Sequence, residues 1–241
     1  MNKAEKPKGK LYLIPTTLGD NEPLEVLPIS IKGAIEGIDH YIVENEKSAR
    51  RFIKKISPRK SQQGLQMQTL NKYTPPESLD SFLNPCMDGL DVGLLSEAGC
   101  PAIADPGSEL VQLAHAKNIQ LVPLVGPSSP ILALMASGLN GQMWAFNGYL
   151  PIEAAERKRA IRNFEKTSRE LRQAQLFIET PYRNDNLLAD LLKTLNPATR
   201  LCVACDLTLP AEYIATKTVA EWRATDLPEL HKRPAIFIFQ G

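Results

Sequence analysis

Short apolar segments alternate with amphipathic segments along the first half of the chain, and this alternation restricts the fold more than any other feature. Five segments have the length and apolar content of strands: 10–15, 38–43, 65–70, 91–95 and 119–125. Helical patterns stand between or after them at 28–36, 46–56, 76–88, 106–117 and 130–137. Strands and helices in this order predict βα units around a mostly parallel sheet.

The second half of the chain has a different pattern. Long helical patterns cover 153–173 and 184–195, and strand-like segments lie at 174–179, 200–205, 212–216 and 234–240. The last three strands can pair as hairpins, which predicts a mixed sheet. We therefore expect an α/β protein with two domains, 1–125 and 126–241, divided near the glycine and proline of "VGPSSP". Residues 1–9 are expected to form a disordered leader.

The loop "SEAGCPAIADPG" (96–107) follows the strand at 91–95 and contains mostly small side chains. Such a loop lets a ligand approach the backbone. Asp105 is the predicted N-cap of the next helix, with Pro106 at its first position. The loops "IPTTLGD" (14–20) and "GPSSP" (126–130) have a similar composition, with Ser128 or Ser129 predicted to cap the helix that follows. Since loops at the carboxyl ends of parallel strands line the ligand crevice, the three loops predict one ligand site; the alternative is a set of tight turns.

Several kinds of site lack their sequence signatures. The chain has no G-x-G-x-x-G, no G-x-x-x-x-G-K-[ST] and no H-E-x-x-H motif. Hydride transfer and nucleotide hydrolysis are therefore disfavoured. Cys202 and Cys205 form a C-x-x-C inside a strand-like segment, where their side chains point to opposite faces, so we expect core cysteines and no metal site. His40, His115 and His231 are scattered and predict no catalytic triad.

The net charge is +1, so contact with RNA would need a local basic patch. Two basic clusters qualify: Arg50, Arg51, Lys54, Lys55, Arg59 and Lys60 within 50–60, and Arg157, Lys158, Arg159, Arg162, Lys166, Arg169 and Arg172 within 157–172. Solvated helix faces are the alternative interpretation. No apolar stretch is long enough for a membrane span, the amino-terminal residues have no signal-peptide pattern, and the four cysteines predict no disulfide framework. A cytoplasmic protein is expected.

Four sequence blocks resemble the tetrapyrrole methylase superfamily, the class III S-adenosylmethionine-dependent methyltransferases. They are "LYLIPTTLGD" (11–20), "LLSEAGCPAIADPGSELV" (94–111), "PLVGPSSPILALMASGL" (123–139) and "LFIETPYRNDNLL" (176–188). Within the superfamily the chain is most similar to the branch that methylates cytidine 2′-hydroxyls of small-subunit ribosomal RNA. That branch carries S-D-A-G-T-P-x-I-S-D-P-G and P-G-P-S-A. The resemblance extends from about Leu11 to Gly241.

This resemblance implies two α/β domains with S-adenosylmethionine in the cleft between them, and a homodimer. Where the motifs match, it assigns cofactor contacts to residues of both halves: Leu18, Ser96, Ala98, Gly99, Cys100, Pro101, Ile103, Ser128, Ser129, Ile178, Thr180, Leu207, Pro234 and Ala235. The catalytic candidates are Glu179 and Glu44, with Tyr182 and Arg183 to orient the substrate. A sulfonium methyl is already activated, so alignment matters most, but a ribose hydroxyl also needs a proton acceptor.

The sequence departs from the RNA-methylating pattern at three places. "ENEK" (44–47) stands where the branch has E-D-T-R, and "CDLTL" (205–209) stands where it has R-E-L-T-K. The first block ends in Gly19-Asp20 in place of Gly-Asn. We expect methyl transfer to a ribose of small-subunit ribosomal RNA. The alternatives are C-methylation of a tetrapyrrole or corrin precursor, or a homologue that binds S-adenosylmethionine or RNA without catalysis.

Overall fold

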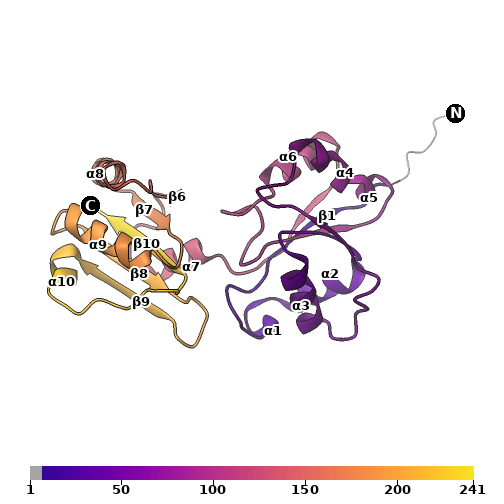
Figure 1. Cartoon of the computed structure of the whole chain (residues 1–241), viewed down its shortest axis with the longest axis horizontal. Helices are drawn as coiled ribbons and strands as arrows, with labels where there is room; N and C mark the ends of the chain where they lie inside the picture. Colours follow the sequence, from indigo (N-terminus) through magenta and orange to yellow (C-terminus); the bar gives the residue numbers. More distant parts are fainter. Residues whose placement is uncertain (1–6) are drawn as a thin grey trace. The chain divides into compact units, whose positions relative to one another are not determined.

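The computed structural model describes residues 7–241 as two compact units, the first ending at Pro127 and the second running from Ser128 to Gly241 (Figure 1). Each unit contains one five-stranded sheet covered by helices. No helix among these residues is long and apolar enough to cross a membrane. The first six residues of the predicted leader lie outside the described part.

Residues 8 and 9 are ordered, so the leader prediction is wrong there. Gly9 is buried and donates its N–H to the Cys86 carbonyl at 2.8 Å. The Lys8 ammonium donates to the Lys117 carbonyl at 2.7 Å. A Cβ at Gly9 would overlap the Leu90 carbonyl, so only glycine fits this contact.

The N-terminal unit contains the predicted parallel sheet. Its strands are β1 (Leu11–Ile14), β2 (His40–Val43), β3 (Gln66–Thr69), β4 (Val92–Leu95) and β5 (Leu121–Pro123). They lie in the order β3-β2-β4-β1-β5, with every pair parallel. The carboxyl ends of all five strands therefore meet at one edge of the sheet, where the small-residue loops begin.

Helices cover both faces of this sheet. They are α1 (Pro23–Val26), α2 (Ile29–Gly37), α3 (Glu46–Ile56), η1 (Pro76–Ser78), α4 (Leu79–Phe82), α5 (Asn84–Met87) and α6 (Ser108–Ala116). Helices α2 and α3 pack on one face through Ile31, Ile35 and Ile53. Leu83 and Leu110 pack on the other face.

Two helix predictions in this unit are wrong in detail. The single helix expected over 76–88 is divided into η1, α4 and α5, because Pro85 cannot donate the hydrogen bond that would continue the preceding turn. Asp105 is not the N-cap of α6. Gly107 holds that position with φ 136° and the helix begins at Ser108, because the chain needs a left-handed residue to turn out of the loop.

The C-terminal unit contains the predicted mixed sheet. Its elements are α7 (Ser129–Ser137), β6 (Trp144–Tyr149), α8 (Ala154–Leu171), β7 (Ala174–Ile178), α9 (Asn184–Thr194), β8 (Arg200–Cys205), β9 (Tyr213–Thr218), α10 (Val219–Arg223) and β10 (Ala235–Gln240). The strand order is β6-β7-β10-β8-β9, and β6–β7 is the one parallel pair of this described sheet. The sequence analysis did not predict α1, β6 or α10.

Aromatic side chains fill the core of this unit. Phe177 of β7 stacks on Phe239 of β10 with ring centroids 5.3 Å apart. Trp222 of α10 is fully buried, and its indole N–H donates to the Leu201 carbonyl at 2.8 Å. Cys202 and Cys205 are fully buried in β8, as expected for core cysteines, and burial raises the pKa of both thiols.

Two glycine-to-alanine substitutions test this description, because they should change the free energy of unfolding in opposite directions. Gly107→Ala should destabilise the protein by about 1–3 kcal/mol, because it places a side chain at φ 136° and a Cβ 2.9 Å from Leu94 Cδ2. Gly33→Ala in α2 is the matched control. Its Cβ meets nothing within 4 Å, so it should stabilise by about 0.5–1 kcal/mol. Urea unfolding measures both, and two changes of the same sign would contradict the description.

Candidate functional site

The loop after β4, residues 96–107, has an unusual backbone. Gly99 and Gly107 are left-handed, and so are Ala102 at φ 63° and Ala104 at φ 61°. A non-glycine residue in this conformation costs about 1–3 kcal/mol, and such strain is concentrated at functional sites. Ala98 and Ile103 are exposed, whereas Gly99 and Pro101 are buried. The loop therefore presents small and apolar groups on a strained, fixed backbone.

Hydrogen bonds join this loop to the loops after β1 and β5. The Gly99 carbonyl accepts from the Ser96 hydroxyl at 2.6 Å and from the Thr16 N–H at 2.9 Å. The Cys100 thiol donates to the Pro127 carbonyl at 3.4 Å. A Cβ at Gly99 would lie 3.1 Å from Leu18 Cδ2 and 3.2 Å from the Pro127 oxygen. The structure thus brings together the predicted cofactor residues of the N-terminal unit: Leu18, Ser96, Ala98, Gly99, Cys100, Pro101 and Ile103.

Three carboxylates lie near one another at the same edge of the sheet. Glu44 follows β2, Glu97 follows β4, and Asp105 belongs to the strained loop. Burial, followed by the charges of Asp105 and Glu97, raises the pKa of Glu44 to about 7. Burial and then Glu97 raise the pKa of Asp105 to about 6. Glu44 Oε1 is buried and has no hydrogen-bond partner among residues 7–241, so it is free to accept a proton.

A cavity of about 360 Å³ opens beside one of these carboxylates, Glu97, within the N-terminal unit. The loop from β1 into α1 forms one wall and α3 forms the other, while Ser96 and Glu97 come from the end of β4. The Ser48 hydroxyl of α3 donates to Glu97 Oε1 at 2.6 Å, which ties the two sides together. The volume falls within the range of small-molecule sites.

The predicted site residues of the C-terminal unit also share one edge of a sheet. Ala235 pairs with Cys205 and Ile236 pairs with Ile178, so the start of β10 lies beside the ends of β7 and β8. This register brings together Ile178, Glu179, Thr180, Leu207, Pro234 and Ala235. The backbone here is strained as well, since Asp206, Thr208 and Lys232 are left-handed. Ser128 and Ser129 lie at the start of α7, where neither side chain caps the helix.

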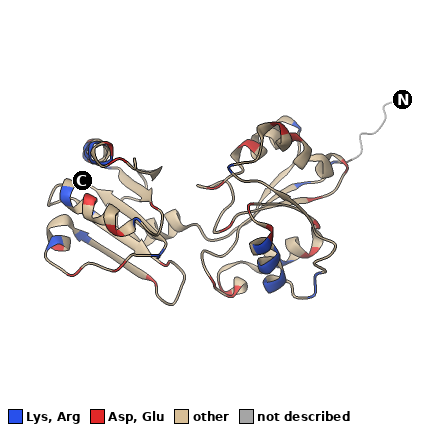
Figure 2. Ribbon diagram, in the orientation of Figure 1, with Lys and Arg blue, Asp and Glu red and all other residues tan. Residues whose placement is uncertain are grey.

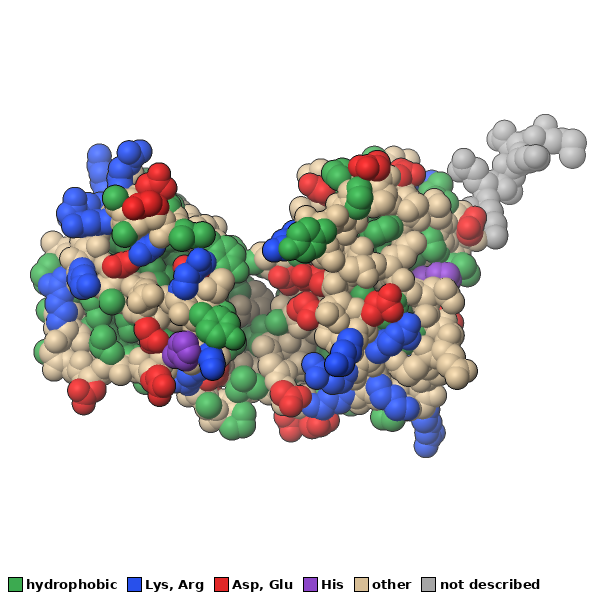
Figure 3. All heavy atoms as spheres, viewed as in Figure 1, with side chains coloured by type: hydrophobic (Ala, Val, Ile, Leu, Met, Phe, Trp, Pro, Cys, Tyr) green, Lys and Arg blue, Asp and Glu red, His purple; other side chains and the backbone are tan. Residues whose placement is uncertain are grey.

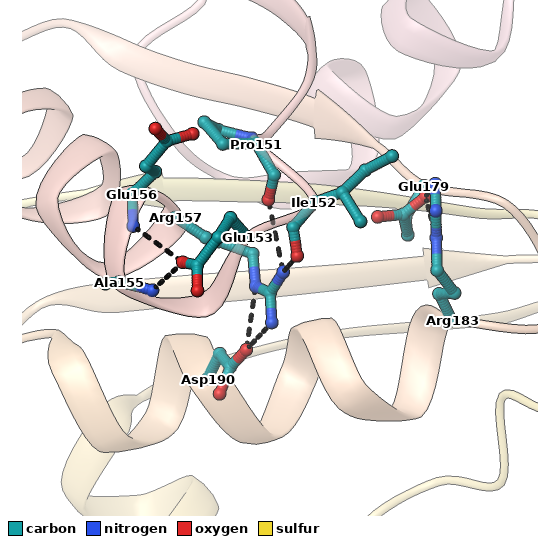
Figure 4. A network of polar contacts seen from close by, with 9 residues as sticks. All are labelled: Pro151, Ile152, Glu153, Ala155, Glu156, Arg157, Glu179, Arg183 and Asp190. Carbon is teal, nitrogen blue, oxygen red and sulfur yellow. Dashed lines mark hydrogen bonds and ion pairs between the residues drawn. The ribbon is translucent and has the colours of Figure 1, made fainter.

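Glu179 and Arg183 form an ion pair (Figure 4). Glu179 Oε1 accepts from Arg183 Nη2 at 2.6 Å, from Arg183 Nε at 3.0 Å and from the Thr180 N–H at 2.6 Å. Its side chain is 4 % exposed. Tyr182 is exposed and meets the His231 ring edge-on, with centroids 5.8 Å apart. Glu179 Oε1 thus accepts three hydrogen bonds, whereas Glu44 Oε1 accepts none from residues 7–241.

The departures at 205–209 have structural explanations. Cys205 stands at the Arg position of the motif, but its side chain is buried in the core. Asp206 forms an ion pair with Arg233 at 2.7 Å. Arg233 also donates to the Ala211 and Glu229 carbonyls at 2.7 and 2.9 Å. In this chain the segment therefore fixes the loop between β8 and β9.

The two basic clusters lie mainly on α3 and α8 (Figures 2 and 3). Most cations of the first cluster already have partners: Arg50 donates to the Gln62 carbonyl, Lys54 to the Pro58 carbonyl, Lys55 to Asp20 and Lys60 to Asp39. In the second cluster, Arg157 forms an ion pair with Asp190 (Figure 4). Arg51 and Arg59 have no ion pair or hydrogen bond with any described residue. The side chains of Lys158, Arg159, Arg162, Arg169 and Arg172 likewise have none within the described chain.

Glu97, Asp105, Ser48 and Phe52 were not predicted from the sequence as residues of this site. Glu97 and Asp105 are the two carboxylates within an otherwise small-residue loop, and that contrast could have identified them. Ser48 and Phe52 carry no comparable signal, because only the packing of α3 places them at the cavity.

The chain is similar in sequence to ribosomal RNA methyltransferases. No protein-family model matches it. It is 28 % identical over 90 % of its length to ribosomal RNA small subunit methyltransferase I of Vibrio cholerae, covering 72 % of that protein. It is 25 % identical over its whole length to the protein of the same name from Buchnera aphidicola, covering 81 % of that chain.

The fold is also that of known methyltransferases. The crystal structure of the methyltransferase CobJ superposes with a TM-score of 0.64 at 14 % identity. The superposition covers 97 % of this chain and 95 % of that one. The arrangement of two α/β units predicted from the sequence is thus found in a solved protein.

Replacing Glu44 by Gln should change how stability depends on pH. The folded-state pKa of Glu44 is raised, so its stabilising protonation is complete below pH ~4.5 and is lost as pH rises through about 7. The variant should be more stable than the wild type at pH 8, by about 1–2 kcal/mol after allowance for partial solvent exposure, and similar at pH 4.5.

Denaturant unfolding at a series of pH values measures this effect. Glu109→Gln, which changes an exposed carboxyl in the first turn of α6, is the control and should keep the pH profile of the wild type. Parallel profiles for Glu44→Gln and the wild type would show that Glu44 titrates normally.

Proposed function

We propose that the chain is a member of the tetrapyrrole methylase superfamily of S-adenosylmethionine-dependent methyltransferases and that it methylates a ribose 2′-hydroxyl in small-subunit ribosomal RNA. The observation that carries the proposal is the sequence similarity to small-subunit ribosomal RNA methyltransferases over at least nine-tenths of the chain. Such an acceptor would place the enzyme in the cytoplasm. The homodimer implied by the sequence resemblance stays a prediction that light scattering can test.

The strained loop after β4 is proposed to hold the methyl donor. It offers a backbone fixed at Gly99, where a side chain would meet Leu18 and Pro127, and an exposed apolar contact at Ile103. These features suit the adenosine and amino-acid portions of S-adenosylmethionine, which need close backbone approach and apolar cover. When bound, the donor supplies an electrophilic methyl group on sulfur. The cofactor residues assigned to the C-terminal unit stay predictions.

Glu44 is proposed as the proton acceptor. Its pKa near 7 means that a substantial fraction is ionised at neutral pH while the carboxylate remains a stronger base than an ordinary glutamate. A ribose hydroxyl loses its proton when it is methylated, and Glu44 would accept that proton on Oε1, which has no hydrogen-bond partner among residues 7–241. Glu97 and Asp105 contribute by raising that pKa.

The exposed, unpaired cations of α8 are proposed to contact RNA phosphates. Lys158, Arg159 and Arg162 are exposed at its amino-terminal half. Contacts of this kind are independent of sequence and weaken steeply with salt. Arg157 is excluded from this role because Asp190 and two backbone carbonyls already bind its guanidinium.

Gly99→Arg tests the assignment of the donor loop. The added side chain would collide with Leu18 and the Pro127 carbonyl at a left-handed position, so S-adenosylmethionine binding measured by calorimetry should fall at least ~100-fold. Gly141→Arg is the matched control, because its Cβ would meet nothing within 4 Å. Equal affinities for the two variants would refute the assignment.

A methyl-transfer assay tests the acceptor. The protein is incubated with labelled S-adenosylmethionine and either ribosomal small subunits or free ribosomal RNA. The RNA should come from a strain in which the gene for this protein is deleted. We expect a 2′-O-methylated nucleoside by mass spectrometry. Transfer to a tetrapyrrole precursor in place of RNA would contradict the proposed acceptor, and no transfer to either would favour a homologue without catalysis.

Glu44→Gln should lower kcat by about 10²–10⁴-fold, because the amide cannot take the proton. Donor affinity should remain unchanged. In the wild type, kcat/KM should rise with pH up to about 7 and then level off, and the variant should lose this dependence. If Glu179→Gln removes the pH dependence and Glu44→Gln keeps it, the roles of the two carboxyls are reversed.

A further inference from the structure

The cavity between the β1–α1 loop and α3 has no role in the proposed function as stated above. We propose that this cavity binds the nucleotide that receives the methyl group, with the guanidinium of Arg51 on its phosphate. This inference rests on the proposed function, because it assumes an RNA acceptor. It adds a binding site and a phosphate-binding residue to that function.

The position of the cavity suits an acceptor. It lies at the carboxyl ends of β1 and β4, and it meets the proposed donor loop at Ser96. Of the predicted cofactor residues, only Leu18 and Ser96 line it, so the remaining wall is available to another molecule. Glu97 stands at its edge and is close enough to Glu44 to raise the pKa of that carboxyl. A hydroxyl held here would thus lie near both the donor loop and the proposed base.

The lining suits a nucleotide. Leu18, Pro23 and Phe52 provide apolar surface, on which an unstacked base can pack. Thr17 and Ser48 already donate their hydroxyl hydrogens to the Gly19 carbonyl and to Glu97, so their oxygens can accept a hydrogen bond from a sugar or a base edge. The cations Arg51 and Lys55 both come from α3, whereas the carboxylate of Glu97 comes from the end of β4. Apolar, hydroxyl and cationic groups therefore surround one space of about 360 Å³, as a nucleotide requires.

Charge pairing identifies Arg51 as the phosphate ligand. Lys55 is the other cation of the cavity, but its ammonium lies 3.2 Å from Asp20 and 3.3 Å from Glu22, and it also donates to the Asn21 carbonyl. Arg51 is exposed and has no such partner within residues 7–241. Its planar guanidinium can donate two parallel hydrogen bonds to a phosphate. Arg51 is therefore the cation of this wall that is free to bind an anion.

Two charge-reversal variants test whether phosphate binds specifically at the cavity or responds only to the overall positive charge of the cluster at 50–60. Arg51→Glu removes the proposed phosphate ligand. Arg59→Glu is the matched control, because Arg59 is also exposed and unpaired in the described chain, makes the same charge change and does not line the cavity. Both side chains are exposed, so both variants should fold, which thermal melting checks.

The first measurement is the kinetics of methyl transfer to ribosomal RNA. Arg51→Glu should lower kcat/KM at least ~10-fold, mostly through KM, because a charge-assisted contact is lost. Arg59→Glu should lower it no more than ~3-fold, and donor affinity should be the same in both variants. Equal losses in the two variants would overturn the cavity assignment and leave the proposed function standing.

The second measurement uses small probes and needs no catalysis. Cytidine 5′-monophosphate and cytidine are titrated against each protein by ligand-detected NMR. In the wild type and Arg59→Glu the monophosphate should bind at least ~5-fold more tightly, and Arg51→Glu should lose this preference. No preference in the wild type, or no saturation at millimolar concentrations, would overturn the assignment. A preference that depends on Arg51 in a protein that methylates no RNA would support the site and overturn the proposed function.

Discussion

The carbonyl of Gly99 is the point on which the candidate site depends. It accepts hydrogen bonds from the Ser96 hydroxyl and the Thr16 N–H, so it joins the loop after β4 to the loop after β1. Ser96 and Thr16 are both buried, and an unpaired carbonyl there would cost about 1–3 kcal/mol. These bonds help to hold a loop whose left-handed alanines oppose its conformation. The positions of Leu18, Ser96 and Glu97, and hence the cavity wall, follow from this junction.

The electrostatics of the candidate site depend on which strand ends lie side by side. Because β2 and β4 are parallel neighbours, the residues that follow them, Glu44 and Glu97, project from the same edge of the sheet. Partial burial then favours the protonated form of Glu44, and the second carboxylate increases that effect. Glu179 also follows a strand, but Arg183 and the Thr180 N–H satisfy its oxygen. Glu179 and Glu44 both follow strands, but their surroundings differ. Glu179 has the Arg183 cation beside it, whereas Glu44 has the carboxylates of Asp105 and Glu97 beside it.

The positions of most strands and helices along the chain were predictable, because they depend on periodicity that is local in the sequence. Ala49, Ile53 and Ile56 are buried along one face of α3, as the helical pattern at 46–56 requires, while Phe52 is half-buried. The start of α6 was mispredicted, because Asp105-Pro106 is a good local start signal but the chain continues in a strained loop to Gly107. β6 was not predicted, because none of its residues is buried and its register shifts near Gly148. The closeness of the Glu44 and Asp105 carboxylates, and the ion pair between Lys55 and Asp20, depend on contacts between distant segments. They could not be predicted from the local sequence pattern.

Acceptor choice must depend on the loops and not on the fold. The same arrangement of two α/β units occurs in CobJ at 14 % identity, so the scaffold by itself does not select between a nucleotide and another acceptor. A cavity of about 360 Å³ lies at the lower end of the range of small-molecule sites, which favours a single nucleotide over a larger acceptor. Lys55 of α3 forms ion pairs with Asp20 and Glu22 of the loop after β1, so this cation bridges the two walls of the cavity. In this chain Asp20 stands where the RNA-methylating pattern has Asn, and a carboxylate there strengthens the attachment to Lys55 while leaving Arg51 as the free cation. With Asp20 in place of Asn, Lys55 is paired, and Arg51 is the cation of α3 at this cavity that can bind an anion.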